Sequence, residues 1–385
     1  MRIAHIADVH LGYRAYSRVT SRGLNQREAD VFRAFRSVLD RVAELDPDLI
    51  IIAGDLFHTV RPSNFAIHQT FRLLSDLRGR TAVPVVIIGG NHDTPKSRDT
   101  GCILDLYTVI EGMYVRHHGF EGIALPGLDA AVYCLPYFAL EERRQHVIRP
   151  DSGRSVNVLA VHGTVEGVIR QSYDSDQVAP GELNLEAWDY VALGHYHIHT
   201  QLADNAFYSG AIEYTSSNIW EEAHEHPKGF IVFDTETRTA SFHETPTVRR
   251  VMDLPPVRAG ALGAAELMEK VEERLAPFAD DLPELIIRLP VEGFPRELQR
   301  DLDWKRLREL KLTALHLDIV FRPARREDRP GESTERGEAR PIEVEWREFA
   351  GSLEDLPAGV DRDRLVDLGL HYLEQAAEEQ QEVPV

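Results

Sequence analysis

The sequence predicts an α/β fold followed by a smaller α+β domain. Short apolar runs rich in Val and Ile alternate with longer amphipathic stretches over the first half of the chain, a pattern typical of buried strands joined by helices. In the second half of the chain, predicted helices and strands follow one another within a short stretch, which indicates the smaller α+β domain. The 385 residues allow two or three domains at about 150 residues each.

Eight apolar runs are predicted as strands because β-branched residues dominate segments that are too short for helices. Amphipathic stretches separate the first five runs, whereas the last three follow one another without helices between them. The sheet is therefore expected to be mixed or doubled. The runs cover residues 3–7, 49–53, 83–88, 156–161, 190–193, 206–209, 229–234 and 239–243.

The stretch after the first run predicts an amphipathic helix. Phe32, Phe35 and Val38 recur at helical spacing and would form one apolar face. Asn25 is the predicted N-cap of this helix. Glu28, three residues later, would complete a capping box.

A small α+β domain is predicted over residues 249–322, after a first domain over residues 1–248. It would contain helices near 261–276 and 296–310 and strands near 284–290 and 312–321.

The end of the chain predicts a charged linker and a helical segment. Residues 323–341 are rich in Pro, Arg and Glu and have no apolar period, which favours a linker. Residues 342–385 regain apolar positions and predict two short helices that cannot close a core alone. We expect them to dock on a partner or on the body of the protein.

Side chains that bind metals follow each of the first five runs. Ligands bind beyond the carboxyl ends of strands in α/β sheets, so these side chains are expected to share one site. Imidazoles with few carboxylates and one amide suit Mn²⁺, Fe²⁺ or Zn²⁺. The residues are Asp8, His10, Asp55, His58, Asn91, His92, Asp93, His162, His195 and His197.

Two pairs among these residues are separated by two positions in the sequence. In an extended segment, residues i and i+2 face the same way. We therefore expect Asp8 with His10, and His195 with His197, each to offer two groups to the same site.

The net charge of −20 argues against a protein that coats nucleic acid through bulk charge. It does not exclude a nuclease, because bound cations carry local positive charge. Five residues that come soon after Asp8 and His10 in the sequence are candidates for local contacts with phosphates. They are Tyr13, Arg14, Arg18, Arg22 and Arg27.

Several observations predict a cytoplasmic location. No apolar run approaches the length of a membrane-spanning helix, and the N-terminus lacks the long apolar region of a signal peptide. Cys102 and Cys134 cannot make a disulfide framework, and we expect both to be buried fillers.

The ordered motifs Asp-x-His, Gly-Asp, Gly-Asn-His-Asp, His-Gly and Gly-His-x-His resemble those of the calcineurin-like metallophosphoesterase superfamily, over roughly residues 1–245. Within it, the sequence is similar to DNA repair nuclease subunits of the SbcD and Mre-eleven type. Two features carry that similarity: Gly-Asp-Leu-Phe-His at 54–58 and His-Leu-Gly-Tyr at 10–13. The resemblance implies a two-sheet core, a mixed β sandwich flanked by helices, with a small α+β capping domain and C-terminal helices.

The resemblance also implies two divalent metal ions, with Mn²⁺ expected. Asp55 would bridge the two ions. Asp8, His10 and His197 would complete one site, and the other would be completed by Asn91, His162 and His195.

Three further residues receive catalytic roles from the resemblance. His92 would contact the phosphate and assist the leaving oxygen, and Asp93 would orient His92. His58 would line the site and affect exonuclease chemistry.

The expected function is a metal-dependent DNA nuclease subunit of an SbcCD-like repair complex, with 3′–5′ exonuclease and endonuclease activity on double-strand ends and hairpins. The capping domain would guide DNA, the tail would bind an SbcC-type ABC ATPase with a coiled coil, and a homodimer is expected. One alternative is a metallophosphatase or small-molecule phosphodiesterase, against which the extra domain and tail argue. Another is a non-enzymatic DNA-end tether, against which the complete ligand set argues.

Overall fold

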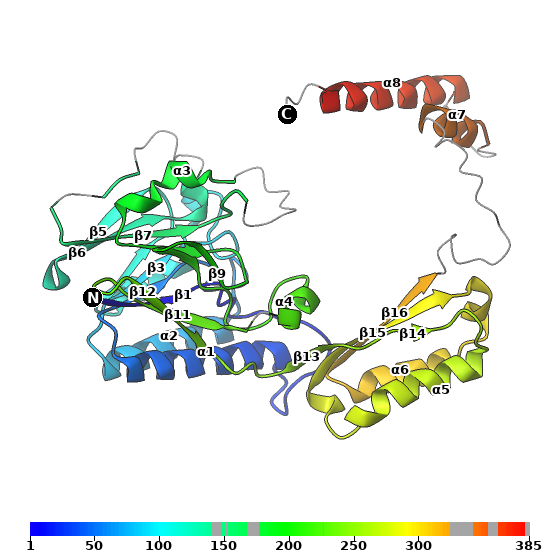
Figure 1. Ribbon diagram of the computed structural model, residues 1–385, viewed down its shortest axis with the longest axis horizontal. Helices are drawn as coiled ribbons and strands as arrows, with labels where there is room; N and C mark the ends of the chain where they lie inside the picture. Colours follow the sequence, from blue (N-terminus) through cyan, green and yellow to red (C-terminus); the bar gives the residue numbers. More distant parts are fainter. Residues whose placement is uncertain are drawn as a thin grey trace. The chain divides into compact units, whose positions relative to one another are not determined.

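The computed structural model describes most of the chain, and its contacts divide the chain into two compact units, Met1–Arg322 and Pro323–Val385 (Figure 1). Most of the predicted linker, residues 324–341, lies outside the described residues. The described residues are 1–140, 148–150, 153–167, 177–225, 227–323, 342–352 and 361–381.

The first sheet has the strand order β12-β11-β1-β2-β3-β4. Strands β1 to β4 run parallel, and β11 and β12 extend the sheet with antiparallel pairings. Helices α1 (Gln26–Leu45) and α2 (Asn64–Arg80) connect β1, β2 and β3. The strands are β1 (Arg2–Ile6), β2 (Leu49–Ile52), β3 (Val85–Ile88), β4 (Met113–Arg116), β11 (Gly229–Asp234) and β12 (Thr239–Glu244).

The second sheet has the strand order β5-β6-β7-β8-β10-β9. Its four central strands are parallel, and β5 and β9 form antiparallel edges. The short helix α3 (Pro180–Leu183) precedes β8. The strands are β5 (Glu121–Leu125), β6 (Ala130–Leu135), β7 (Val156–His162), β8 (Tyr190–Gly194), β9 (Thr200–Ala203) and β10 (Ala206–Tyr208).

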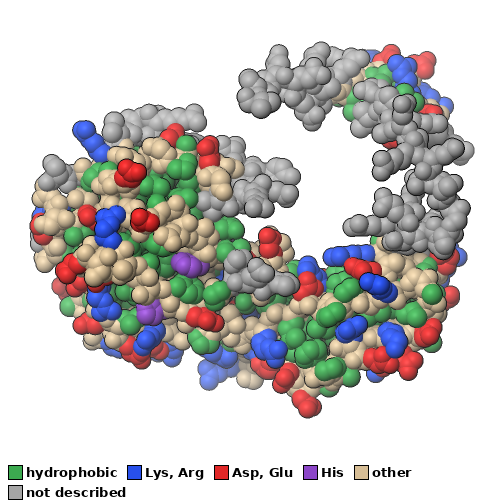
Figure 2. Space-filling view, viewed as in Figure 1, with side chains coloured by type: hydrophobic (Ala, Val, Ile, Leu, Met, Phe, Trp, Pro, Cys, Tyr) green, Lys and Arg blue, Asp and Glu red, His purple; other side chains and the backbone are tan. Residues whose placement is uncertain are grey.

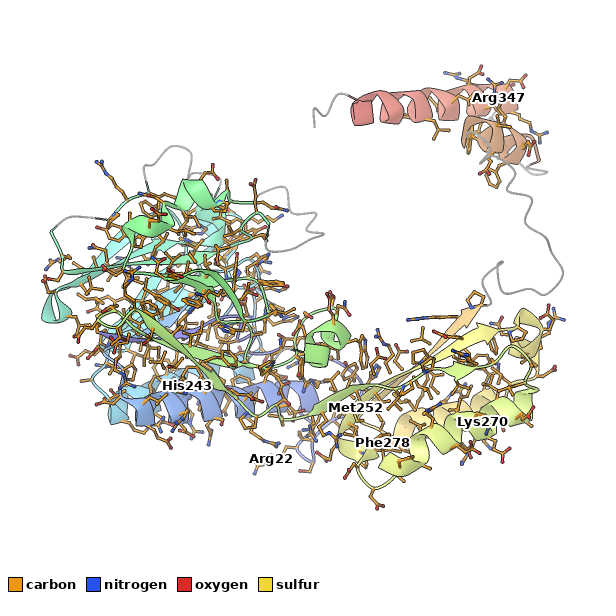
Figure 3. The ribbon with its side chains drawn as sticks, viewed as in Figure 1. Arg22, His243, Met252, Lys270, Phe278 and Arg347 are labelled. Carbon is orange, nitrogen blue, oxygen red and sulfur yellow. The ribbon has the colours of Figure 1, made fainter. Side chains whose placement is uncertain are left out.

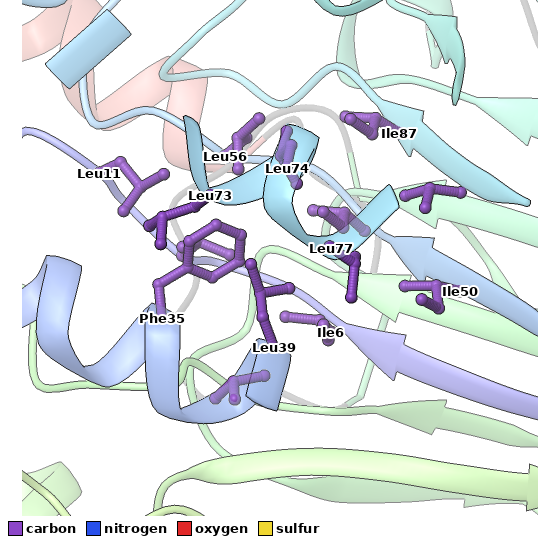
Figure 4. Packing of buried hydrophobic residues seen from close by; sticks show 14 of the residues in the cluster. Ile6, Leu11, Phe35, Leu39, Ile50, Leu56, Leu73, Leu74, Leu77 and Ile87 are labelled. Carbon is purple, nitrogen blue, oxygen red and sulfur yellow. The ribbon is translucent and has the colours of Figure 1, made fainter. Parts of the chain in front are cut away.

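The two sheets stack on a shared apolar core. Leu49 and Ile51 of β2 belong to the core between the sheets, together with Val158 of β7. Ile50 and Ile52 point the other way, into the core beneath α1 and α2 (Figure 4). Strand β2 is thus buried on both faces, which explains its unbroken apolar run. The predicted α/β class with two mixed sheets is confirmed.

Helix α1 begins as predicted at Asn25, whose Oδ1 accepts from the backbone N–H groups of Arg27 and Glu28. The predicted capping box is wrong, because the Glu28 carboxylate bonds elsewhere. It accepts from Arg14 Nε at 2.7 Å and from Ser63 Oγ at 3.2 Å. Glu28 therefore ties the loop before α1 to the N-terminus of α2.

A third, four-stranded sheet forms the small domain after residue 249. Strands β13 and β14 both pair in parallel with β15, and β16 also pairs with β15. The predicted helix near 296–310 is two elements, a 3₁₀ turn over Arg296–Arg300 and then α6, which Asp303 caps. The elements are β13 (Arg250–Asp253), β14 (Val257–Arg258), α5 (Ala264–Leu275), β15 (Leu285–Phe294), α6 (Trp304–Thr313) and β16 (His316–Pro323).

Helix α4 (Ile219–Glu225) lies between β10 and β11 in the chain and packs against β13 of the small domain (Figure 1). Tyr16 stacks on His316 with ring centroids 3.8 Å apart. Arg249 binds the Asp30 carboxylate of α1 through two nitrogens, at 2.9 and 3.1 Å. These contacts join the small domain to helix α1, helix α4 and the loop before α1 in the first domain.

The second unit contains helices α7 (Ile342–Ser352) and α8 (Arg362–Gln381). Trp346 Nε1 donates to the carbonyl oxygen of Val366 at 3.0 Å, and its ring covers Gly369 so closely that a Cβ there would clash. Among the described residues, no helix combines the length and apolar character needed to cross a membrane. Cys102 and Cys134 are buried and unpaired, as predicted.

Candidate active site

The candidate site lies where the carboxyl ends of β1, β2 and β3 of the first sheet meet those of β7 and β8 of the second. A cleft of about 1170 Å³ opens there. The predicted metal and catalytic residues lie in this cleft or directly beneath it. Those that line it are His10, Asp55, His58, His92, His195 and His197.

One group of donors consists of Asp8, His10 and His197, whose ligand-type atoms all lie within 4.8 Å of one another. The Nε2 atoms of His10 and His197 are 3.0 Å apart. The Asp8 carboxylate also accepts from the backbone N–H of His195, at 3.0 and 3.1 Å. This bond connects the ends of β1 and β8.

A second group centres on Asn91. Its Oδ1 lies 3.1 Å from both His162 Nε2 and His195 Nδ1. His162 Nδ1 donates to the carbonyl oxygen of Ala53 at 2.9 Å, which places the proton on Nδ1. In the neutral ring, the lone pair of His162 Nε2 therefore faces the site, as a metal ligand requires.

Asp55 lies between the two groups. Its Oδ2 is 3.7 Å from His10 Nε2 and 3.4 Å from His162 Nε2, and its Oδ1 accepts from the His92 backbone N–H at 2.9 Å. Burial opposes charge on both partners of the Asp55–His162 pair, but their mutual attraction outweighs it. The pKa of Asp55 is lowered and the pKa of His162 is raised to about 9.

The backbone is strained at four candidate ligands. The φ angles are +52° at Asp8, +53° at His10, +51° at Asp55 and +100° at His195, a region that residues with a Cβ adopt rarely. The expectation that Asp8 and His10 converge through strand alternation is therefore wrong. They reach the same site because left-handed turns after β1 direct both inward.

Two glycines are needed for the close approach of site residues. Gly54 has a φ of +91°, and a Cβ there would lie 2.0 Å from His162 Nδ1. A Cβ on Gly90 would lie 2.0 Å from Asp55 Oδ1. Any larger residue at either position would displace a candidate ligand.

His58 and His92 lie beside the candidate metal ligands. Their rings stack with centroids 5.1 Å apart, and His58 Nδ1 lies 3.3 Å from His10 Nδ1. His92 Nδ1 donates to the backbone carbonyl of His58 at 3.1 Å. Burial, with His92 adding to it, lowers the pKa of His58.

Asp93 acts on the loop rather than directly on His92. Its carboxylate accepts from the backbone N–H groups of Gly90 at 2.9 Å and Phe57 at 3.3 Å. The predicted orientation of His92 by Asp93 stays a prediction, and the bond that holds the His92 ring is to the carbonyl oxygen of His58. Burial, followed by the nearby Asp55 charge, raises the pKa of Asp93 to about 7.

Glu222 and Lys228 lie beside His197, and the sequence analysis did not identify them. Both are buried, and Lys228 Nζ bonds the Glu222 carboxylate. Burial alone would raise the pKa of Glu222, but His197 and Lys228 bring it down to about 2. Neither residue follows a strand end or belongs to a motif, so no sequence signal distinguished them from surface charges.

Of the predicted DNA-binding residues, Tyr13 lines the cleft and packs edge-on to His58 with centroids 4.9 Å apart. Arg14 is held by Glu28, and Arg18 lies 3.5 Å from the carbonyl oxygen of Leu312. Arg22 is exposed on the loop before α1 (Figure 3).

Arg27 cannot contact phosphates as suggested. Its side chain is 1% exposed and binds Asp30 and Glu213 within the protein.

The donor set fits a pair of divalent cations. Imidazole nitrogens and carboxylate or amide oxygens point at one another across short distances, and Asp55 contacts both groups. The Nε2 atoms of His10 and His197 lie within hydrogen-bonding distance, a contact in which only one of the two nitrogens uses its lone pair. A cation between them would use both lone pairs.

Comparison with known proteins agrees with this geometry. The family model described as "Calcineurin-like phosphoesterase" matches residues 1–199. The chain belongs to the calcineurin-like phosphoesterase family. Members of this family use divalent metal ions, and the described residues include His and Asp clusters able to bind them. The resemblance inferred from the order of the motifs is confirmed.

Within the phosphoesterases, the chain is similar to archaeal proteins named "DNA double-strand break repair protein Mre11". It is 26% identical to that of Methanocaldococcus jannaschii over 61% of this chain and 62% of the relative. The Methanococcus maripaludis protein is 27% identical over 61% of this chain and 63% of the relative. The Methanopyrus kandleri protein is 31% identical over 51% of this chain and 45% of the relative. Each match spans less than two thirds of the relative's length.

Proposed function

We propose that this protein is a metal-dependent DNA nuclease subunit that acts on double-strand ends and hairpins. The observation that carries the proposal is the pair of donor groups joined by Asp55 at the base of a cleft, with His92 and His58 beside them. Similarity to proteins named for double-strand break repair supports DNA as the substrate. We further propose 3′–5′ exonuclease and endonuclease activity within an SbcCD-like complex.

The proposed ligands of the two ions are those that the resemblance implied. Asp55 would contact both ions, and the other six residues would divide between the two groups described above. When bound, two divalent ions would neutralise the phosphate and supply a nucleophile from water at neutral pH. The mixture of nitrogen donors with carboxylate and amide oxygens suits Mn²⁺, Fe²⁺ or Zn²⁺, and we propose Mn²⁺ among them on the resemblance to the nuclease subunits. The ligands are Asp8, His10, Asp55, Asn91, His162, His195 and His197.

His92 is the proposed contact to the reacting phosphate. Its backbone N–H and its Nδ1 are both occupied, by Asp55 and by the His58 carbonyl. Nε2 is therefore the ring atom that would hold a proton toward the leaving oxygen. Asp93 supports this geometry by bonding the backbone at Gly90 and Phe57.

DNA would be held by local contacts rather than by bulk charge. Tyr13 lines the cleft, and Arg14, Arg18 and Arg22 follow it on the same loop. On the face shown in Figure 2, acidic and basic side chains are interspersed over the small domain. The small domain, which contacts this loop through Tyr16, would cap the cleft and guide the duplex.

We propose that the C-terminal helices bind an SbcC-type ABC ATPase with a coiled coil. The hairpin of α7 and α8 leaves large apolar side chains exposed, which favours a partner. These side chains are Val344, Phe349, Leu368 and Tyr372.

A homodimer is also proposed. Phe65 at the start of α2 is exposed, and so are Leu106 and Val109 on the 3₁₀ segment Ile103–Val109, which packs on α2 through Tyr107 and Phe71. Exposed large apolar side chains on neighbouring segments favour an interface between subunits. A cytoplasmic location is proposed on the sequence evidence.

The test is cleavage of blunt and hairpin DNA with Mn²⁺, with and without the ATPase, alongside hydrolysis of a mononucleotide ester. The proposal predicts metal-dependent cleavage of DNA. Activity on the ester but not on duplex ends would instead favour a phosphatase or small-molecule phosphodiesterase. DNA binding without hydrolysis of either substrate would favour an end tether.

A further inference from the structure

A buried ion pair behind His197 is not used by any role described so far. The side chains of Lys228 and Glu222 are 1% and 6% exposed, and the ammonium group bonds the carboxylate. Lys228 Nζ also donates to the backbone carbonyl of His197 at 2.9 Å. Two charges lose much hydration on burial, and a buried pair is weak evidence for stability. A role linked to His197 is therefore worth testing.

The Glu222 carboxylate faces the rear nitrogen of the His197 ring. Its Oε1 lies 3.6 Å from Nδ1, and this buried nitrogen has no hydrogen-bond partner among the described residues. The front nitrogen, Nε2, lies 3.0 Å from His10 Nε2 in the candidate site. The ring thus stands between a carboxylate and the donor group.

His162 is arranged like His197, but a backbone carbonyl takes the place of the carboxylate behind its Nδ1 atom. His162 donates Nδ1–H to the carbonyl of Ala53, which leaves Nε2 for the site. A carboxylate behind a ligating histidine fixes the tautomer in the same way and makes the ligand more basic. A short movement of the ring or of the carboxylate would turn the 3.6 Å contact into a hydrogen bond.

We propose that Glu222 is a positioning residue that fixes the tautomer and orientation of His197 for metal binding, with Lys228 holding both in place. The inference rests on the proposed function, because it requires His197 to be a ligand. Lys228 balances the charge of Glu222, so the pair adds no net charge behind the metal centre. It also anchors the His197 backbone through its second hydrogen bond.

The test compares Mn²⁺ affinity and stoichiometry, measured by titration calorimetry, in the parent and in Glu222→Gln. Glutamine keeps the size of the side chain and can still accept from Lys228, but it is a weaker acceptor for Nδ1–H. We expect the weaker Mn²⁺ site to lose about 10–100-fold in affinity. The matched control is Glu244→Gln, which removes the same charge from an exposed side chain on β12, outside the cleft, and should leave affinity unchanged.

The melting temperature of the protein before Mn²⁺ is added separates positioning from folding. A purely structural ion pair would lower the melting temperature of Glu222→Gln and leave its Mn²⁺ affinity at the parent value, which would overturn the inference. Failure of the parent to bind Mn²⁺ would overturn the proposed function and this inference together.

A second variant covers the case in which Glu222→Gln is poorly folded. The double change Glu222→Leu with Lys228→Met removes both charges together, so no unpaired charge stays buried. We expect the folded double variant to bind Mn²⁺ as weakly as Glu222→Gln or more weakly. Parent affinity in the double variant would show that no carboxylate is needed and would overturn the inference.

Discussion

Asp55 Oδ2 lies 3.4 Å from His162 Nε2, and this contact joins the ends of two different sheets. Asp55 follows β2 of the first sheet, whereas His162 is the last residue of β7 in the second. The candidate site is therefore assembled only when the two sheets stack. Asp55 is the residue that contacts donors from both groups.

Asp55→Ala should remove both metal ions and abolish cleavage, because the proposed bridge is lost. Metal content per chain, measured by mass spectrometry after dialysis, should fall from two toward zero. Circular dichroism should show that the variant is folded. Two ions retained in the folded variant would rule out Asp55 as the bridge.

His92→Ala should retain both ions and lose turnover by about 10²–10⁴-fold, the range of a general acid or base. The reason is that His92 is assigned to the phosphate and not to an ion. Metal content and kcat are measured on the same preparation. His68→Ala on the exposed face of α2 serves as the control. Loss of metal together with activity would show that His92 is a ligand instead.

His58→Ala should keep both ions and impair trimming of duplex ends more than hydrolysis of a small activated phosphodiester. A duplex end must be held in register, whereas a small ester with a good leaving group needs only the metal centre. The readout is the ratio of the two activities at one metal and one salt concentration. Equal losses would assign His58 to the shared chemistry, and no loss would leave it without a functional role.

The buried side chain of His5 should make the free energy of unfolding decrease at acid pH. It is fully buried in β1 with Nδ1 2.8 Å from Tyr190 Oη, and burial, with a smaller effect of His199, lowers its pKa to about 3. The unfolded chain binds this proton near pH 6.5 and the folded chain only near pH 3. The stability that depends on an uncharged His5 is therefore fully present above about pH 6.5 and is lost as the pH falls toward 3.

The corresponding experiment uses His5→Gln, which cannot titrate. The free energy of unfolding of the parent should fall by roughly 2 kcal/mol more than that of the variant between pH 7 and pH 5. Urea unfolding at several pH values measures the difference. Parallel pH profiles would show that His5 binds its proton equally in both states.

Deletion of residues 342–385 should leave a folded, metal-bound phosphoesterase that no longer joins the ATPase. The exposed apolar side chains of α7 and α8 are the reason to expect this outcome. Co-purification with the ATPase is the measurement. A truncated chain that still co-purifies would refute the partner role. A lowered melting temperature would indicate that the helices pack on the body.

The sequence was sufficient to predict the site's location, since ligand-type residues follow five buried runs and parallel strands end at one edge. The doubled sheet was also expected, but the apolar runs did not show which strands belong to which sheet, because β2 and β7 have similar apolar runs. The contact of Asp55 with His162 depends on how the sheets stack, which no local pattern encodes.

Other features escaped prediction for equally physical reasons. The left-handed turns at Asp8 and His10 are imposed by the surrounding structure, since neither residue prefers that conformation. Glu28 matched a capping box in spacing, but Arg14 and Ser63 compete for its carboxylate. Glu222 meets His197 only through tertiary packing. The functional roles of all the site residues remain predictions.

The central claim is that the residues around Asp55 hold two divalent ions in one cleft. Anomalous diffraction from crystals grown with Mn²⁺ tests it most directly. The account predicts two anomalous peaks, one beside His10 and His197 and one beside His162 and Asn91, with Asp55 touching both. A single peak, or peaks that Asp55 does not contact, would contradict it.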